Sequence, residues 1–261
     1  MTLEYFPVLA YHKISPHIEF GLTTIHPEIF EKQLQLIQKS GFKPLTFIDL
    51  HANPLLPDKP VIITFDDGYE SLYQYALPIL KNYGFKAVIY VLSDYIGKIN
   101  NWEAYKIQRH HRHLNVDQIQ ELVDSGFEIG SHGKSHNYLP ALNNYQLHQE
   151  LMVSKKEISD ITGGDIISFC YPYGVSNMQI EENVKKSGYH FAVGNLELGS
   201  IKAPRNFHIG RRSIYAIDSM RVFEQKLQKP TLSHTSVFTE RVIRAGASAA
   251  IIKKILTNKL N

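Results

Sequence analysis

The 261-residue chain has a single cysteine, Cys170. One thiol excludes an internal disulfide and the paired-cysteine motifs of structural zinc sites. No stretch reaches the roughly 18 apolar residues of a membrane span, and residues 1–14 lack the long apolar run of a signal peptide. The net charge of +3 is too small to indicate a nucleic-acid partner. We therefore expect a chain that is cytoplasmic as written; peripheral membrane association and non-classical export stay open.

Thirteen histidines stand out in an otherwise ordinary composition, with 43% hydrophobic and 20% charged residues. Short strand patterns alternate with helix patterns that end at glycines, which predicts parallel strands joined by crossover helices. About seven such units favour a barrel. In parallel α/β folds the functional residues lie at the carboxyl ends of the strands, and the candidate residues below occupy such positions. We predict a domain over residues 1–230 and an amphipathic, basic helical tail over 231–261. The tail could instead bind a membrane surface or a partner.

The stretch TFDDG, residues 64–68, places two carboxylates directly after an apolar strand. Adjacent like charges raise each other's cost of ionisation. A lone Asp-Gly pair most often marks a turn. Successive residues at a strand end point in different directions, so one of Asp66 and Asp67 could face a metal ion while the other faces a water.

The stretch SHGKSH, residues 131–136, spaces His132 and His136 four residues apart, after another predicted strand. On a helix or in a tight turn two such side chains can share one cation. Capping or surface histidines are the alternative. Two histidines and one aspartate would form a three-ligand site with an open position, which is the pattern of catalytic metal sites.

Three further features could contribute to a site. In FCYPYG, residues 169–174, Tyr171 and Tyr173 offer flat rings that could stack on a sugar, although a plain loop is equally compatible. His12 follows the first strand and could act as a general acid. The histidines of residues 109–113 could form a second metal site, but a solvated loop is the favoured interpretation, and Trp102 could line a substrate groove.

The motifs TFDDG, HGKSH and YPYG, in this order and spacing, resemble those of the polysaccharide deacetylases of the NodB-homology group, carbohydrate esterase family four. The resemblance runs from Phe6 to Tyr215. It implies an α/β fold, a distorted (β/α)7-type barrel, and removal of N-acetyl or O-acetyl groups from sugars. It also implies a divalent metal, Zn²⁺ above all, with Co²⁺, Ni²⁺ or Mn²⁺ as alternatives.

Transferred by position, the resemblance implies that Asp66 is the general base and that Asp67, His132 and His136 are the metal ligands. The backbone N–H of Tyr173 would stabilise the oxyanion. Substrate contacts would come from Tyr171, Pro172 and Trp102.

The resemblance leaves two positions for the catalytic acid. The initial strand with its Tyr-His pair resembles the subgroup that acts on poly-N-acetylglucosamine, where this histidine comes from the N-terminal strand; that implies His12. The more usual order places it in a late LxH motif, which LSH with His234 matches, but Pro230 disfavours a strand there, so His12 is the favoured position.

Two residues depart from the family pattern. Gly133 stands where serine or threonine usually follows the first histidine, and Cys170 stands where an arginine usually contacts the base. Arg205, Arg211 and Arg212 are candidates to replace that arginine. We expect a metal-dependent N-deacetylase acting on an acetylated, N-acetylglucosamine-containing glycan. An inactive carbohydrate-binding homologue and an amidase for non-sugar amides are the alternatives.

Overall fold

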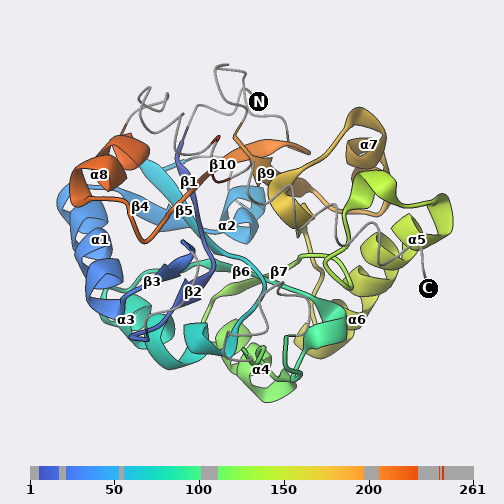
Figure 1. Cartoon of the computed structure of the whole chain (residues 1–261), viewed down its shortest axis with the longest axis horizontal. Helices are drawn as coiled ribbons and strands as arrows, with labels where there is room; N and C mark the ends of the chain where they lie inside the picture. Colours follow the sequence, from blue (N-terminus) through green and yellow to red (C-terminus); the bar gives the residue numbers. More distant parts are fainter. Residues whose placement is uncertain are drawn as a thin grey trace.

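A computed structural model describes residues 6–17, 22–52, 56–100, 111–196 and 206–228, with positions 241 and 243 (Figure 1). Its strands are β1 (Val8–Tyr11), β2 (Lys13–Ile14), β3 (Thr24–Ile25), β4 (Lys43–Leu45), β5 (Pro60–Phe65), β6 (Val88–Val91), β7 (Glu128–Ser131), β8 (Ser168–Cys170), β9 (Phe191–Asn195) and β10 (Ile209–Ser213). Among the described residues, no helix has the length and apolar character needed to cross a membrane.

Seven parallel strands form a closed barrel. Their order is β1-β10-β9-β8-β7-β6-β5, and β5 pairs back with β1, while β4 pairs with the first three residues of β5. Strands β2 and β3 form a separate pair. The expected distorted (β/α)7-type barrel is therefore confirmed.

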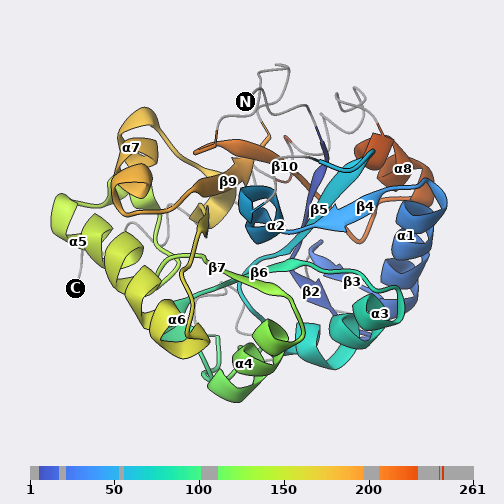
Figure 2. The same cartoon turned by 180° about the vertical axis from the view of Figure 1, so that it is seen from behind.

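Most of the described helices surround the strands (Figures 1 and 2). The helices are α1 (Pro27–Lys39), α2 (Phe47–Ala52), α3 (Leu77–Asn82), α4 (Val116–Asp124), α5 (Asn144–His148), α6 (Ser154–Thr162), α7 (Met178–Lys186) and α8 (Met220–Gln228), with π-helices η1 (Leu72–Ala76) and η4 (Gln149–Val153) and three-residue 3₁₀ turns at Ser93–Tyr95, Leu139–Ala141 and Pro172–Gly174. Several begin at asparagine caps; Asn115 and Asn143 each form a capping box with a glutamine three residues later.

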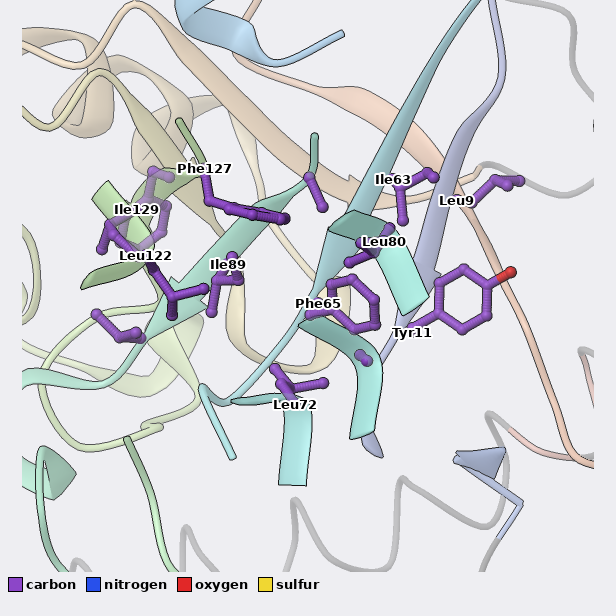
Figure 3. Close-up of a cluster of buried hydrophobic side chains, with 14 of the residues drawn as sticks. Leu9, Tyr11, Ile63, Phe65, Leu72, Leu80, Ile89, Leu122, Phe127 and Ile129 are labelled. Carbon is purple, nitrogen blue, oxygen red and sulfur yellow. The ribbon is translucent and has the colours of Figure 1, made fainter. Parts of the chain in front are cut away.

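The alternation of side chains along each strand creates two separate cores. Val61, Ile63 and Phe65 of β5 point outward and pack against the helices, in the layer that Figure 3 shows. Ile62 belongs to a second cluster inside the barrel, which includes Phe47 of α2, stacked on Phe191 at 5.2 Å. Helix α2 thus lies among the strands rather than in the outer ring (Figures 1 and 2). Because Ile62 points inward, Thr64 and Asp66 do so as well.

Two segments depart from simple sequence patterns. The stretch LTFI, residues 45–48, is typical of a strand, but β4 ends at Leu45, and Phe47 and Ile48 begin α2. A proline inside a helical pattern is typical of a kink, but Pro78 lies in the first turn of α3, directly after η1. The predicted tail lies outside the described residues apart from positions 241 and 243, so both domain boundaries stay predictions.

Candidate active site

The predicted general base and acid lie side by side at the carboxyl ends of two paired strands. The register pairs Tyr11 with Phe65, and the N–H of Asp66 donates to the carbonyl of Tyr11 at 2.9 Å. His12 therefore follows β1 next to Asp66, with its Nε2 3.9 Å from Oδ2 of Asp66. Burial lowers the pKa of the His12 imidazole to about 4, although the neighbouring Asp66 carboxylate acts in the opposite direction.

Arg211 of β10, which pairs with β1 beside β5, holds the Asp66 carboxylate. Its two terminal nitrogens donate to Oδ1 and Oδ2 at 2.6 and 2.7 Å, and one also donates to Thr64 Oγ1 at 2.9 Å. Burial favours the neutral acid, but the guanidinium outweighs it and holds the pKa of Asp66 well below its usual value. Of the three candidate arginines, Arg211 thus provides the missing cation.

Cys170 lies directly beside this ion pair. Its Sγ is 3.1 Å from an Arg211 nitrogen and 3.6 Å from Asp66 Oδ1. Both Cys170 and Arg211 point into the barrel, so the guanidinium from β10 reaches the base over the small side chain on β8. The position that the family usually fills with arginine is therefore small because the cation comes from another strand.

Asp67, His132 and His136 together could hold a metal ion. One potential ligand atom from each lies within 4.8 Å of the others, and Asp67 Oδ1 is 3.6 Å from Nε2 of both histidines. Ligands about 2.1 Å from a tetrahedral ion stand roughly 3.4 Å apart. His132 Nδ1 donates to the Cys170 carbonyl at 2.8 Å, which directs the lone pair of Nε2 toward Asp67. This donor set fits a divalent cation.

A second, overlapping group consists of Asp66, His132 and Cys170. Both oxygens of Asp66 already accept from Arg211. Burial also raises the pKa of the Cys170 thiol well above its usual value, which keeps the sulfur protonated. A positive guanidinium and a thiol make this group a poor cation site, so the Asp67 group is the better candidate.

A left-handed turn separates the two adjacent carboxylates. Asp67 has φ 68°, and Gly68 follows with φ 64° at a point where a Cβ would lie 2.8 Å from Val91 Cγ1. Only glycine fits such a position without displacing the neighbouring strand. The turn sends the Asp66 side chain to Arg211 and that of Asp67 to the histidines, as expected for two carboxylates with different partners.

His113 supports this turn, which the sequence did not indicate. The segment around residues 109–113 was expected to be a solvated loop, but the His113 side chain is buried and its Nδ1 donates to the Asp67 carbonyl at 2.7 Å. Tyr69 and His113 also form an antiparallel bridge. The solvated-loop interpretation is wrong for His113. A single histidine in a polar stretch offered no local signal for this role.

The aromatic loop after β8 differs from the expectation. Tyr171 is 0% exposed, and its hydroxyl donates to the Phe207 carbonyl at 2.8 Å; Pro172 is also buried. Tyr171 follows β8 and packs, as Phe169 does, in the outer layer against the helices, so neither its ring nor the buried Pro172 is available to stack on a sugar. Tyr173 instead lies at the site, its ring 4.6 Å from that of His136. Trp102 and His234 lie outside the described residues.

Comparison with known proteins decides the family. Residues 55–192, more than half of the chain, match the family model described as polysaccharide deacetylase. The chain belongs to the polysaccharide deacetylase family. It is 31% identical over 191 residues to YxkH of Bacillus subtilis, which is classed with the polysaccharide deacetylases, covering 72% of this chain and 63% of that one.

Other polysaccharide deacetylases agree with this assignment. The chain is 24% identical over 194 residues to the poly-beta-1,6-N-acetyl-D-glucosamine N-deacetylase of Staphylococcus aureus, across 70% of this chain and 64% of that protein. The crystal structure of the polysaccharide deacetylase BC0361 from Bacillus cereus superposes with a TM-score of 0.71 at 26% identity, covering 85% of this chain and 69% of that one. The chain thus spans just under two thirds of the curated relatives it matches.

Proposed function

We propose that this polysaccharide deacetylase is a metal-dependent enzyme that hydrolyses N-acetyl groups on an N-acetylglucosamine-containing glycan. The observation that carries the proposal is the three-ligand group of Asp67, His132 and His136 immediately beside the ionised, arginine-paired Asp66. The name of the Staphylococcus aureus relative supports the sugar and the N-acetyl linkage. Cys170, in place of the family's arginine, does not argue for an inactive homologue, because Arg211 contacts the base instead.

Two imidazoles and a carboxylate are a donor set that suits Zn²⁺, with Co²⁺, Ni²⁺ and Mn²⁺ as alternatives. A bound divalent cation would supply Lewis acidity, which polarises the acetyl carbonyl and acidifies a water molecule. The ligand histidines are neutral in this role; burial lowers the pKa of His132, which favours that form.

The remaining residues would move the protons. Asp66, kept ionised by Arg211, accepts a proton from the attacking water; its oxygens have lone pairs beyond those used by the guanidinium. The N–H of Tyr173 stabilises the oxyanion, and the Tyr173 carbonyl accepts from Asn195 Nδ2 at 2.8 Å, which helps to fix this residue at φ 60°. His12 is neutral near pH 7 because burial lowers its pKa to about 4, so it must first take up a proton. The proton that the adjacent Asp66 accepts from the water, 3.9 Å away, can pass to His12, which then delivers it to the leaving amine.

The central test measures acetate release from a panel of acetylated glycans and small non-sugar amides, after chelation and again after addition of each metal. Asp66→Asn should retain the metal and lose about 10²- to 10⁴-fold in rate, as removal of a general base does. His132→Ala should lose the metal by elemental analysis. Full activity of Asp66→Asn would contradict the base assignment, and release from the amides alone would contradict the substrate class.

The acid is tested by comparing His12→Ala with His234→Ala. Because His12 lies beside Asp66, we expect His12→Ala to lower kcat on substrates with poor leaving groups far more than His234→Ala. An activated ester with a good leaving group serves as control, since it needs no proton on the departing atom. A larger loss in His234→Ala would transfer the acid role to the late motif.

A further inference from the structure

The loop that carries His132 and His136 encloses a buried carboxylate from a distant helix. Glu150 of η4 is 2% exposed. Its Oε2 accepts from the backbone N–H groups of Lys134 and Ser135, at 2.6 and 3.1 Å. Its Oε1 accepts from Ser135 Oγ at 2.5 Å and Asn137 Nδ2 at 2.9 Å. Four donors of one short loop therefore converge on a single side chain.

Gly133 makes room for this carboxylate. Its φ is +86°, and a Cβ built on it would lie 2.7 Å from Oε2 of Glu150. Consecutive N–H groups beside a left-handed residue form a concave anion site, which here is filled from within the chain. The glycine that departs from the family pattern thus coincides with a carboxylate in the space that a side chain at position 133 would need.

The helix that carries Glu150 is itself fastened to strand β7. Ser154 Oγ donates to the Glu150 carbonyl at 2.5 Å and lies 3.1 Å from Ser131 Oγ. Ser131 Oγ in turn accepts from the N–H of Gly133 at 3.1 Å. The π-helical turn η4 lies between α5 and α6, and such turns change which residues face inward. Both the backbone and the side chain of Glu150 are therefore tied to the loop.

We propose that Glu150 is a positioning residue that holds His132 and His136 in their metal-binding arrangement, and that Gly133 is required because Glu150 occupies the loop. The proposal rests on the proposed function only in that Asp67, His132 and His136 bind a metal. It follows from the donors involved. Without the carboxylate, the N–H groups of Lys134 and Ser135 and the Ser135 hydroxyl lose this acceptor, Asn137 keeps only its bond to Ser135 Oγ, and the loop rearranges.

The first test measures Zn²⁺ and Co²⁺ affinity of the metal-free full chain by competition with a chromophoric chelator, together with the visible spectrum of the Co²⁺ form. Glu150→Gln keeps the size of the side chain but presents an amide to the loop donors. We expect a 10- to 100-fold loss of affinity, as for other outer partners of metal ligands, and a changed Co²⁺ spectrum. Wild-type affinity and spectrum would overturn the proposal.

Glu157→Gln is the matched control. Glu157 lies on α6, the continuation of the same helix, and accepts from Lys134 Nζ at 2.8 and 3.0 Å, but it contacts the side chain of the loop rather than its backbone. Because this pair is 41% exposed on the glutamate side, its loss should change affinity by less than about fivefold. An equal loss in both variants would overturn the proposal, since any weakening of the helix would then suffice.

A second, independent test uses the glycine. Gly133→Ala should weaken metal binding in the wild type, and should weaken it much less when combined with Glu150→Ala, which removes the obstructing carboxylate. Gly41→Ala is the control for left-handed strain, since Gly41 has φ +78° with nothing within 4 Å of an added Cβ; it should lower the melting temperature and leave metal affinity unchanged. Equal losses from Gly133→Ala in both backgrounds would overturn the steric link.

These affinities require no substrate. A chain that shows the expected pattern of metal affinities but releases no acetate from any glycan would overturn the proposed function and leave the role of Glu150 intact. If the wild type releases acetate but Glu150→Gln binds metal as tightly as the wild type, the proposed function stands and the role of Glu150 is overturned.

Discussion

Two buried carboxylates inside the same barrel differ in their charge state. Asp66 lies at the carboxyl end of β5 and pairs with Arg211 through two short hydrogen bonds. Glu128 lies at the start of β7 and accepts from neutral donors, the Ser168 hydroxyl at 2.5 Å and the N–H of Ile48 at 2.9 Å. The pKa of Asp66 is held well below its usual value, whereas burial raises the pKa of Glu128 to about 7.

Burial acts in the same direction on both groups, so the difference comes from the cation. A guanidinium stabilises the ionised form of Asp66, which a general base requires. Neutral donors only reduce the burial cost for Glu128. Glu128 instead fastens the first turn of α2, whose N–H groups point at it, to the barrel interior. One end of the barrel is thus arranged for charge and the other for holding the structure together.

The largest expected effect comes from removing the cation. Arg211→Met should leave Asp66 buried without its partner and lower the free energy of unfolding by about 3–5 kcal/mol. It should also abolish acetate release, because the pKa of Asp66 would then rise. Chemical denaturation of the metal-free protein measures the first effect.

The double variant Asp66→Asn with Arg211→Met is the control for this prediction. It removes both charges, so part of the lost stability should return. If Arg211→Met alone were as stable as the wild type, the ion pair would not be what distinguishes the two ends of the barrel.

A smaller effect is expected from Glu128, through the pH dependence of stability. In the folded protein the Glu128 carboxyl keeps its proton up to about pH 7, whereas in the unfolded chain it releases the proton near pH 4.5. The contribution of Glu128 is therefore full below pH 4.5 and is lost as the pH rises through about 7. A pKa shift of this size corresponds to a contribution on the order of 3 kcal/mol to the free energy of unfolding.

Glu128→Gln should remove this pH dependence of stability, since an amide does not titrate. The stability of the variant relative to the wild type should therefore be higher at pH 8 than at pH 5. Thermal unfolding across this range measures it. Glu182→Gln is the control, an exposed carboxylate of α7, and should leave the pH dependence unchanged. If Glu128→Gln kept the pH dependence of the wild type, another group would cause it. The Asp66 carboxylate has the opposite effect on this pH dependence, because its stabilisation is lost as the pH falls.

The smallest effect is expected at Cys170. Its thiol lies 3.6 Å from Asp66 Oδ1 and 3.1 Å from an Arg211 nitrogen, but the carboxylate also accepts two shorter, charged hydrogen bonds from the guanidinium. Cys170→Ala should cost about 1 kcal/mol for the lost volume and retain most of the acetate release. Denaturation and kinetics on the same preparation measure both. Loss of activity with unchanged stability would show that the sulfur itself tunes the base.

Local pattern predicted most of the elements and the ligand group. Apolar strand patterns followed by Asp66, Asp67 and His132 indicated where the strands end, and parallel strands bring such ends together. The alternation along β10 also contained a usable signal for Arg211, since a charged residue two positions after Ile209 must face the interior. Which of three arginines meets the base could not be derived from that alternation alone.

The roles of Glu150, His113 and Tyr171 were beyond local pattern. Glu150 sits in a helix whose amphipathic pattern looks ordinary, and its carboxylate reaches the loop through a π-helical turn that no sequence feature marked. His113 was placed in a solvated loop because its neighbours are polar. Tyr171 was expected at the substrate because tyrosine often forms sugar contacts, but it directly follows β8 and packs in the outer layer against the helices.

The sequence by itself determined the strand–helix alternation, the inward face of each strand and the motifs that contain both carboxylates and both histidines, because these depend on neighbours within a few residues. Only the tertiary structure decided the partners. Arg211 reaches Asp66 across 145 positions of the chain, and Glu150 reaches the metal-ligand loop from another element. Such contacts depend on the register in which the barrel closes, and that register is set by all seven strands together.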